Sequence, residues 1–403
     1  MTGGCYNLMM PAVSDPVVAV PAPRALPIDW RNMGLLVLVH VAAVAGLAIY
    51  LPVHGLTLAA ALIGLVLTVV SIFSISAGYH RLFSHRAYEA HPVLRFLLLA
   101  FGAGAFQNSA LAWAADHRRH HGNTDSDEDP YDARRGFWYS HIGWVVRKTD
   151  PSIPATPVRD LERDPLVVWQ DRHYAVVGIS MGLVLPVLLG LACGDLWGGF
   201  VMGAAVRLLL VYHATFSINS FAHRFGSQPY SDRSTARDSL LTALVSMGEG
   251  YHNFHHTFPA DYRNGVRAHQ FDPTKWALRA MAAVGLARRL HCTPPPAILR
   301  ARLRMDDRRL EAMPVPPAVR QRLQGLRAMI DRALVQWHDL LSHYEAKRLE
   351  TRDQASDVLA GIRAEMLKAG RELRRLHATW KRALRSPALL MTWNAEPPGA
   401  PSI

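Results

Sequence analysis

The segment LTLAAALIGLVLTVVSIFSISAGYHRLFSHR, residues 56–86, joins an apolar run directly to two histidines, His80 and His85. Residues Leu56–Gly78 contain no Asp, Glu, Lys or Arg, and a helix needs about 20 predominantly apolar residues to cross a bilayer. Further predominantly apolar runs of spanning length are Met33–Leu51, Ala175–Cys193 and Gly199–Phe221. The apolar run Leu94–Phe106 is too short to span, so we expect it to be re-entrant or interfacial. The sequence therefore predicts an all-α integral membrane protein with four transmembrane helices.

The basic residues that flank the four spans predict their orientation. The short connections 52–55 and 194–198 contain neither Lys nor Arg, whereas both outer flanks and the long segment between the second and third spans contain several. Because Lys and Arg accumulate on the cytoplasmic side, we expect both termini and the central segment there. If the source is bacterial, the protein belongs in the inner or plasma membrane. The net charge of +12 then indicates an anionic membrane surface or substrate, and not nucleic acid.

Nine histidines border the apolar segments, and in this topology all of them lie on the cytoplasmic side. They are His80 and His85, then His117, His120 and His121, then His223, and finally His252, His255 and His256. Residues at i, i+3 and i+4 share one face of a helix, so each triplet presents three imidazoles that can bridge two neighbouring metals. Asn219 precedes His223 by four residues and faces the same region. Because positions five apart diverge on an α-helix, we expect the chain to leave regular helix between His80 and His85.

The donor set limits the choice of metal. Imidazole nitrogens suit Fe, Zn, Cu or Ni, and their number favours a two-metal centre in a cytoplasmic helical cap. Six other histidines are expected to be structural, namely His40, His54, His91, His141, His173 and His213. Three scattered cysteines are too few for a disulfide framework or a thiolate metal site. A non-enzymatic zinc store or a transport protein remains an alternative, although a transport path should place polar groups inside the spans.

The motifs around these histidines resemble those of the membrane-bound acyl-CoA desaturases, the stearoyl-CoA Δ9 group. The resemblance runs from about Asp29 to about Pro273. It includes Ser-Ala-Gly-Tyr-His-Arg-Leu-Phe-Ser-His-Arg (76–86), Phe-Gln-Asn (106–108), Trp113, Asp-His-Arg-Arg-His-His (116–121), Asp129-Pro130, Arg-Arg-Gly-Phe (134–137), Ser-His-Ile-Gly-Trp (140–144), Arg147-Lys148, Asn-Ser-Phe-Ala-His (219–223) and Gly-Glu-Gly-Tyr-His-Asn-Phe-His-His (248–256). Each motif alone is modest, but their order and spacing are highly specific.

The resemblance implies a di-iron centre held by the nine histidines, with Asn219 holding a water near one metal. It implies O2 as co-substrate, an acyl-CoA or other acyl thioester as substrate, and a double bond made in a chain that lies in a tunnel. The implied residues for the substrate are Gln107, Asn108, Trp113, Arg147 and Lys148, the last two as phosphate partners. The electrons would come from a separate ferredoxin, cytochrome b5 or flavin reductase, because the sequence contains no haem, iron–sulfur or dinucleotide-binding motif.

Two features of the motifs refine this interpretation. The first cluster is His-x4-His and the third begins with His252, which favours the Δ9 acyl-thioester group over other desaturases. Relatives commonly carry an Arg where this chain has Ala115, so one contact to the thioester carrier is missing. A related di-iron lipid hydroxylase is the second hypothesis, since both reactions begin with removal of a hydrogen atom.

The two ends of the chain differ from its middle. Residues 1–28 are rich in Pro and Val and are expected to form a disordered leader, and residues 29–300 the membrane domain. Residues 301–403 are Arg-rich and contain no spanning run. Apolar residues recur there at helical spacing, from Leu323 to Leu341 and from Val358 to Trp380. We expect two amphipathic helices that form a hairpin or a coiled coil, and a membrane-surface or redox-partner module is the alternative.

Overall fold

The computed structural model describes residues 26–153, 156–350 and 356–385. Its α-helices are α1 (Trp30–His54), α2 (Leu58–Phe73), α3 (Pro92–Ala103), α4 (Ala110–Asn123), α5 (Arg159–Glu162), α6 (Pro165–Arg172), α7 (Tyr174–Ile179), α8 (Leu185–Ala192), α9 (Leu196–Phe200), α10 (Arg207–Arg224), α11 (Leu240–Val245), α12 (His252–Thr257), α13 (Pro273–Ala283), α14 (Pro295–Glu311), α15 (Pro317–Glu350) and α16 (Ser356–Arg385). The 3-10 helix is η2 (Ala133–Arg135), and the π-helices are η1 (Ser74–Ser84), η3 (Tyr139–Gly143), η4 (Ser180–Val184) and η5 (Val201–Val206). A two-residue strand β1 (Glu89–Ala90) pairs antiparallel with β2 (Ala287–Arg288).

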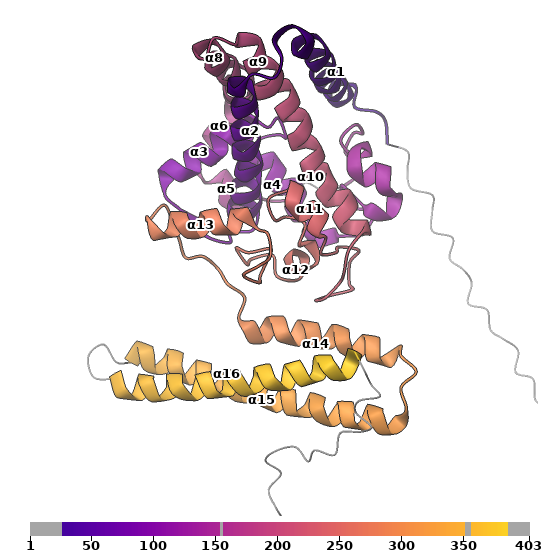
Figure 1. The fold of residues 1–403 in the computed structure, drawn as a ribbon, viewed down its shortest axis with the longest axis vertical. Coiled ribbons are helices and arrows are strands. Elements are labelled where there is room, and N and C mark those ends of the chain that lie inside the picture. The colour runs from indigo at the N-terminus through magenta and orange to yellow at the C-terminus, as the bar shows by residue number, and fades with distance from the viewer. Residues whose placement is uncertain (1–25, 154–155, 351–355, 386–403) are drawn as a thin grey trace, which may run out of the picture.

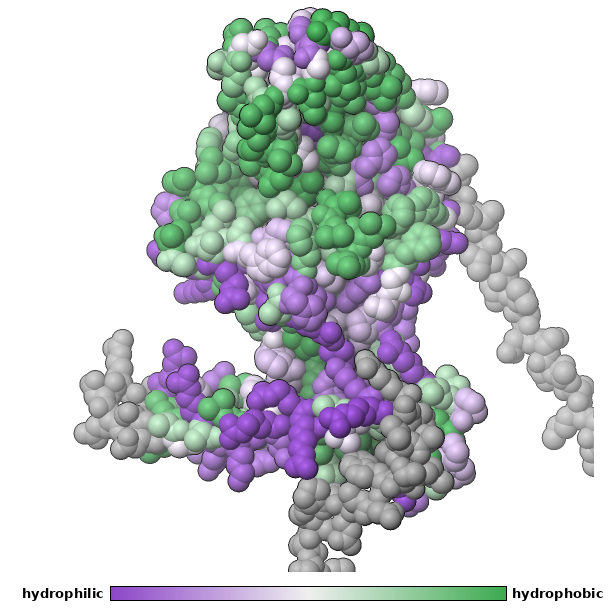
Figure 2. All heavy atoms as spheres, viewed as in Figure 1, coloured by the Kyte–Doolittle hydropathy of each residue, from purple (hydrophilic) through white to green (hydrophobic). Residues whose placement is uncertain are grey.

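Four helical segments are long and apolar enough to cross a membrane, as predicted. They are Trp30–His54, Leu58–Ser84, Tyr174–Ala192 and Leu196–Arg224, and the last three run through π-helical turns without ending. These helices form the upper body of the molecule (Figure 1), and their outer surface is apolar (Figure 2). Leu38, Ile49 and Leu65 are each more than half exposed. An apolar surface of this extent belongs in lipid, so the chain is an integral membrane protein.

A buried arginine joins three of these spans. The Arg207 guanidinium donates to the carbonyl oxygens of Gly203 (2.7 Å), Gly104 (3.0 Å) and Gly182 (2.9 Å) and to Ser71 Oγ (2.8 Å). A charge inside a membrane helix is costly unless polar groups surround it. These four acceptors therefore hold α10, α2 and η4 together around the cation, with the turn after α3 supplying one carbonyl.

The second span continues as a π-helix where the first histidines lie. Its backbone makes i→i+5 hydrogen bonds, and the His85 amide donates to the His80 carbonyl oxygen at 3.1 Å. In such a turn, of about 4.4 residues, positions five apart lie roughly 50° apart, whereas on an α-helix they diverge by about 140°. The chain does leave α-helical geometry, as predicted, and the wider turn puts both imidazoles on one face.

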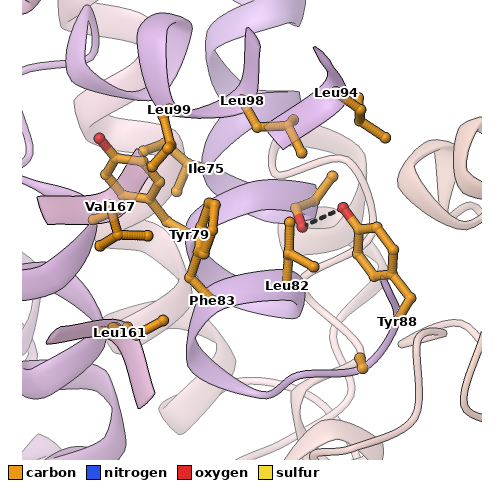
Figure 3. Packing of buried hydrophobic residues seen from close by; sticks show 14 of the residues in the cluster. Ile75, Tyr79, Leu82, Phe83, Tyr88, Leu94, Leu98, Leu99, Leu161 and Val167 are labelled. Atoms are coloured by element: carbon orange, nitrogen blue, oxygen red, sulfur yellow. Dashed lines mark hydrogen bonds between the residues drawn. The ribbon is translucent and has the colours of Figure 1, made fainter. Parts of the chain in front are cut away.

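An apolar cluster packs behind this π-helix. Figure 3 shows Tyr79, Leu82 and Phe83 of η1 among Leu94, Leu98 and Leu99 of α3, with Leu161 and Val167 beyond. The Tyr88 hydroxyl donates to the Ala77 carbonyl oxygen at 2.9 Å. The predicted interfacial run is therefore the short helix α3, which packs on the back of η1 and supports it.

The N-terminal boundary differs from the predicted one. Residues 1–25 lie outside the described part, but residues 26–28 are ordered. Ile28 forms a β-bridge with Arg147, and the Lys148 amide donates to the Pro27 carbonyl oxygen at 3.0 Å. The assignment of residues 26–28 to a disordered leader is wrong, because backbone pairing that composition does not reveal holds them.

In the described C-terminal part, residues 295–350 and 356–385, there are three helices, of which α15 and α16 are the predicted amphipathic pair and pack against each other (Figure 1). Helix α14 was not predicted, and residue 300 lies inside it. One face of α14 meets the hairpin through Leu303 and Leu310, and Trp380 Nε1 donates to Asp306 Oδ2 at 3.1 Å. The other face places Ala301 against Tyr230 and Phe254 of the cap. Helix α14 thus lies between the hairpin and the helix α12.

Candidate dimetal centre and acyl cavity

The structure brings all nine predicted histidines into two adjacent groups. One group contains His80, His85, His117, His121 and His255, and the other contains His120, His223, His252 and His256. Within each group one ring nitrogen per residue lies within 4.8 Å of all the others. Elements η1, α4, α10 and α12 supply them, so residues from both ends of the membrane domain meet at one place.

The two triplets are shared between the groups. On α4, His117 and His121 belong to the first group and His120 to the second. On α12, His255 belongs to the first group and His252 and His256 to the second. The i, i+3, i+4 spacing fans each triplet over an arc wide enough to serve two centres. Two short helices therefore position ligands for both.

The spacing of the ring nitrogens fits metal ions. His255 Nε2 lies 2.9 Å from His80 Nε2 and 2.9 Å from His121 Nε2. In the other group, His120 Nε2 lies 3.2 Å from His256 Nε2. Two nitrogens at about 2.1 Å from one ion and at right angles are roughly 3.0 Å apart. The buried His223 Nε2 has no hydrogen-bond partner among the described residues. Five and four imidazoles thus present donor atoms that suit two transition-metal ions.

A buried ionic network stands behind the first group. His80 Nδ1 lies 2.7 Å from Glu249 Oε2. Arg81 Nη2 donates to Glu249 Oε1 at 2.9 Å and to Asp272 Oδ1 at 3.0 Å. Asn264 and Ser76 also donate to Glu249. A carboxylate at the distal nitrogen of a ligating histidine orients the ring and raises its basicity.

The second group has carboxylates of its own. His120 Nδ1 lies 2.8 Å from Asp129 Oδ1. His223 Nδ1 lies 2.8 Å from Thr235 Oγ1, and that hydroxyl donates to Asp125 Oδ1 at 2.7 Å. The two groups therefore have separate outer partners, Glu249 for one and Asp129 with Asp125 for the other.

Electrostatics keep these imidazoles in the form that binds metals. Burial, followed by repulsion from neighbouring imidazoles, lowers the pKa of six histidines outside the spans: His85, His117, His121, His252, His255 and His256. Burial alone would raise the pKa of Glu249, but its interactions with His80 and Arg81 outweigh burial and hold that pKa well below its usual range. Neutral rings and ionised carboxylates are the protonation states that a metal site requires.

A cavity of about 530 Å³ opens beside the first group, with His80, His117 and His252 in its wall. It is lined by all of the residues that the resemblance implied for substrate and water: Gln107, Asn108, Trp113, Arg147, Lys148 and Asn219. Its volume lies within the range of small-molecule sites. Trp113 stacks on His117 with ring centroids 4.8 Å apart. The predicted substrate residues therefore share one cavity with three of the nine histidines.

The wall of this cavity contains strained backbone. Phe106 and Asn108, on either side of Gln107, have φ of +52° and +73°. Asn tolerates this region, but a bulky residue such as Phe does not adopt it without cost. Gln107 Nε2 donates to Thr215 Oγ1 at 3.0 Å. Backbone strain of this kind clusters at ligand sites, and here it directs the Gln107 side chain toward α10.

Three histidines that were expected to be structural lie apart from both groups. His213 Nε2 is 3.1 Å from His40 Nε2, and His213 Nδ1 is 3.1 Å from His141 Nε2. His141 Nδ1 is 2.8 Å from Ser220 Oγ. This hydrogen-bonded chain links α1, α10 and η3.

Sequence reasoning missed the residues behind the ligands. Glu249, Asp129 and Asp125 were not assigned a role, although Glu249 precedes His252 by three residues. A carboxylate near a histidine cluster was the available signal. Arg81 and Asp272 are 191 residues apart, and no sequence signal pairs them.

Four membrane-crossing helices joined to a cap with nine clustered histidines define a membrane protein with a candidate dimetal site. The model of the fatty acid desaturase family matches residues 56–291, more than half of the chain. The chain therefore belongs to the fatty acid desaturase family.

Named relatives agree with this family. The probable acyl-CoA desaturase of Schizosaccharomyces pombe is 42% identical over 271 residues, which are 66% of this chain and 56% of the relative. Acyl-CoA desaturase 1 of Saccharomyces cerevisiae is 44% identical over 239 residues, 59% of this chain and 47% of the relative. Stearoyl-CoA desaturase 5 of Bos taurus is 39% identical over 266 residues, which are 64% of this chain and 78% of the relative. The chain thus spans about half the length of the two yeast relatives.

Proposed function

We propose that this protein introduces a cis double bond into a saturated fatty acyl thioester in an O2-dependent reaction. The observation that carries the proposal is the shared cavity, which opens onto the five-histidine group and holds the predicted substrate residues. The family and the acyl-CoA desaturase names of its relatives support the same reaction.

In this proposal two iron ions occupy the two histidine groups. The metal ligands are His80, His85, His117, His121 and His255 for one ion and His120, His223, His252 and His256 for the other, with Asn219 acting through a water. Iron would supply the reactivity toward O2 that removes hydrogen from an unactivated methylene. Glu249 and Asp129 hold His80 and His120 in orientation through their Nδ1 atoms.

The acyl chain lies in the cavity, and the charged end of the substrate lies at its mouth. Gln107, Asn108 and Trp113 bound the chain beside the first group, and Arg147 and Lys148 meet the phosphates of the carrier. Acyl-CoA is the substrate that the names of the relatives favour. The His-x4-His form of the first cluster supports the Δ9 position.

The stoichiometry requires an external electron donor. Removing two hydrogens from adjacent methylenes and reducing O2 to two waters consumes two further electrons and two protons. A ferredoxin, cytochrome b5 or flavin reductase on the cytoplasmic side would supply the electrons.

The basic flanks of the spans support a cytoplasmic location for both termini and for the histidine cap. The division into a membrane domain and a C-terminal helical extension belongs to the same proposal.

Product analysis tests this function. The chain is expressed in a host that lacks its own desaturase, and cellular fatty acids are analysed by gas chromatography with mass spectrometry. We expect a new monounsaturated fatty acid that depends on O2 and is absent with the His120→Ala variant. Hydroxylated lipid alone would favour the hydroxylase, and absence of any O2-dependent product would favour a metal-binding protein without this activity.

A further inference from the structure

Arg119 lies on α4 between the candidate ligands His117 and His120, but it faces the cavity and not the metal groups. Its side chain is only 8% exposed, and it lines the cavity together with Trp113 and Arg147. Arginine stays protonated at any physiological pH. The wall of the proposed acyl cavity therefore contains a buried positive charge.

In the described part of the chain this guanidinium has one long ion pair, to Asp116, and no hydrogen-bond acceptor at Nε. Arg119 Nε is buried with no hydrogen-bond acceptor. Its Nη2 is 3.9 Å from Asp116 Oδ1, beyond hydrogen-bonding distance. The neighbouring Arg118, in contrast, donates to both carboxylate oxygens of Asp160 at 2.7 and 2.8 Å. One of two adjacent guanidiniums is thus fully engaged in structure, and the other is not.

Four other charged groups of the cavity wall have polar contacts of their own. Arg135 Nη1 donates to the Tyr139 hydroxyl, and Arg147 Nη1 donates to the Leu26 carbonyl oxygen, both at 2.7 Å. Asp129 contacts His120, and Glu249 contacts Arg81. An unsatisfied buried donor in a cavity wall indicates a ligand. The Asp116 carboxylate, 3.9 Å from Arg119 Nη2, does not reach the guanidinium with a hydrogen bond and leaves Nε without an acceptor.

We infer that Arg119 binds a phosphate group of the acyl carrier, and this inference rests on the proposed function. A thioester has no carboxylate, so the anionic oxygens of such a substrate are the phosphates of its carrier, and a guanidinium fork matches them. Ala115 lies four residues earlier on the same helix face and offers no charge. The phosphate contact on α4 therefore lies one turn farther along the helix, by about 6 Å.

Binding measurements on the full-length protein in detergent test this inference without turnover. The two probes are palmitoyl-CoA and S-palmitoyl-pantetheine, which share the chain, the thioester and the pantetheine arm, whereas only palmitoyl-CoA has the phosphates and the adenosine. Isothermal titration is carried out without O2 on the wild type, Arg119→Met, Arg119→Lys and the control Arg289→Met. Arg289 is highly exposed and lies outside the cavity.

We expect Arg119→Met to weaken palmitoyl-CoA binding about 10- to 100-fold, the range for a hydrogen bond to a charged group. Binding of palmitoyl-pantetheine should change less than twofold. Arg119→Lys keeps the charge and loses the fork, so its affinity for palmitoyl-CoA should be intermediate. Arg289→Met should match the wild type with both probes. Palmitoyl-acyl carrier protein, measured in parallel, shows which phosphate-bearing carrier is preferred.

Two results would overturn the inference: unchanged palmitoyl-CoA affinity in Arg119→Met, or equal weakening for both probes. The second would mean that Arg119 contacts the thioester or only supports the fold. Metal content and melting temperature are measured for each variant, and if Arg119→Met does not fold, Arg119→Lys decides by the same comparison. Failure to form a double bond in the product test would refute the proposed function, while a phosphate-dependent effect of Arg119 would still stand.

Discussion

Exchanging Glu249 for Gln should loosen one metal and leave the other in place. Glu249 lies 2.7 Å from His80 Nδ1 in the five-histidine group, and Asp129 lies 2.8 Å from His120 Nδ1 in the four-histidine group. Each carboxylate is buried and serves one group. Glu249→Gln and Asp129→Asn each preserve the shape of the side chain and remove its charge. Each variant should therefore weaken metal binding in its own histidine group and serve as the control for the other group.

The structure sets the magnitude of the effect. Loss of an outer carboxylate typically lowers metal affinity 10- to 100-fold, which corresponds to about 1.4–2.8 kcal/mol. Removing one member of a buried ion pair costs roughly 3–5 kcal/mol of stability. Arg81 retains its second carboxylate, Asp272, at 3.0 Å, so the stability loss in Glu249→Gln should lie at the lower end of that range.

The assay equilibrates each purified variant with iron and a competing chelator, followed by elemental analysis. We expect the wild type to hold about two ions per chain, and each variant to fall toward one at a chelator concentration that spares the wild type. The double variant should fall toward zero. Glu89→Gln, which alters an exposed ion pair with Arg289, is the control. If either single variant lost both ions together, or if neither lost any, the assignment of separate outer partners would be refuted.

Three further predictions follow from the same structure. His120→Ala should abolish desaturation and lower metal content while the protein still inserts into the membrane, whereas His173→Ala should keep most of its activity in the same assay. Deleting residues 313–403 should preserve bound metal, because α14 remains and still covers Phe254. Deleting residues 295–403 also removes Ala301 from that contact and should lower the metal content. Equal metal content in both truncated proteins would contradict this prediction. Burial raises the pKa of Asp238 to about 7 from its usual 3.8, so this group alone makes stability fall as pH rises from about 4 to 7, whereas the buried histidines contribute in the opposite direction. Denaturant titrations of the wild type and Asp238→Asn isolate the Asp238 contribution: the unfolding free energy of the wild type minus that of the variant should fall over this pH range, and a constant difference would refute the assignment.

Local sequence patterns were enough to predict the membrane spans, the gathering of the nine histidines at one place and the C-terminal pair of helices. A span is recognised from about 20 neighbouring residues, and each histidine cluster lies within a few residues of a helix end. The amphipathic spacing around Leu323 and Trp380 is equally local. Such features depend on helix geometry alone, and the sequence by itself determined them.

Only the tertiary structure decided how these parts divide and what supports them. The separation of the histidines into groups of five and four depends on how η1, α4, α10 and α12 meet in space. The contact of Arg81 with Asp272 joins residues that are distant in the chain, and the unsatisfied Nε of Arg119 shows only once the cavity around it has formed. Helix α14 was not predicted because arginines interrupt its apolar residues, so no single apolar face is visible in the sequence. In the fold its apolar residues divide between two faces, one against the hairpin and one against the cap. Pairing across long sequence separations is a property of the packed fold, and no local pattern encodes it.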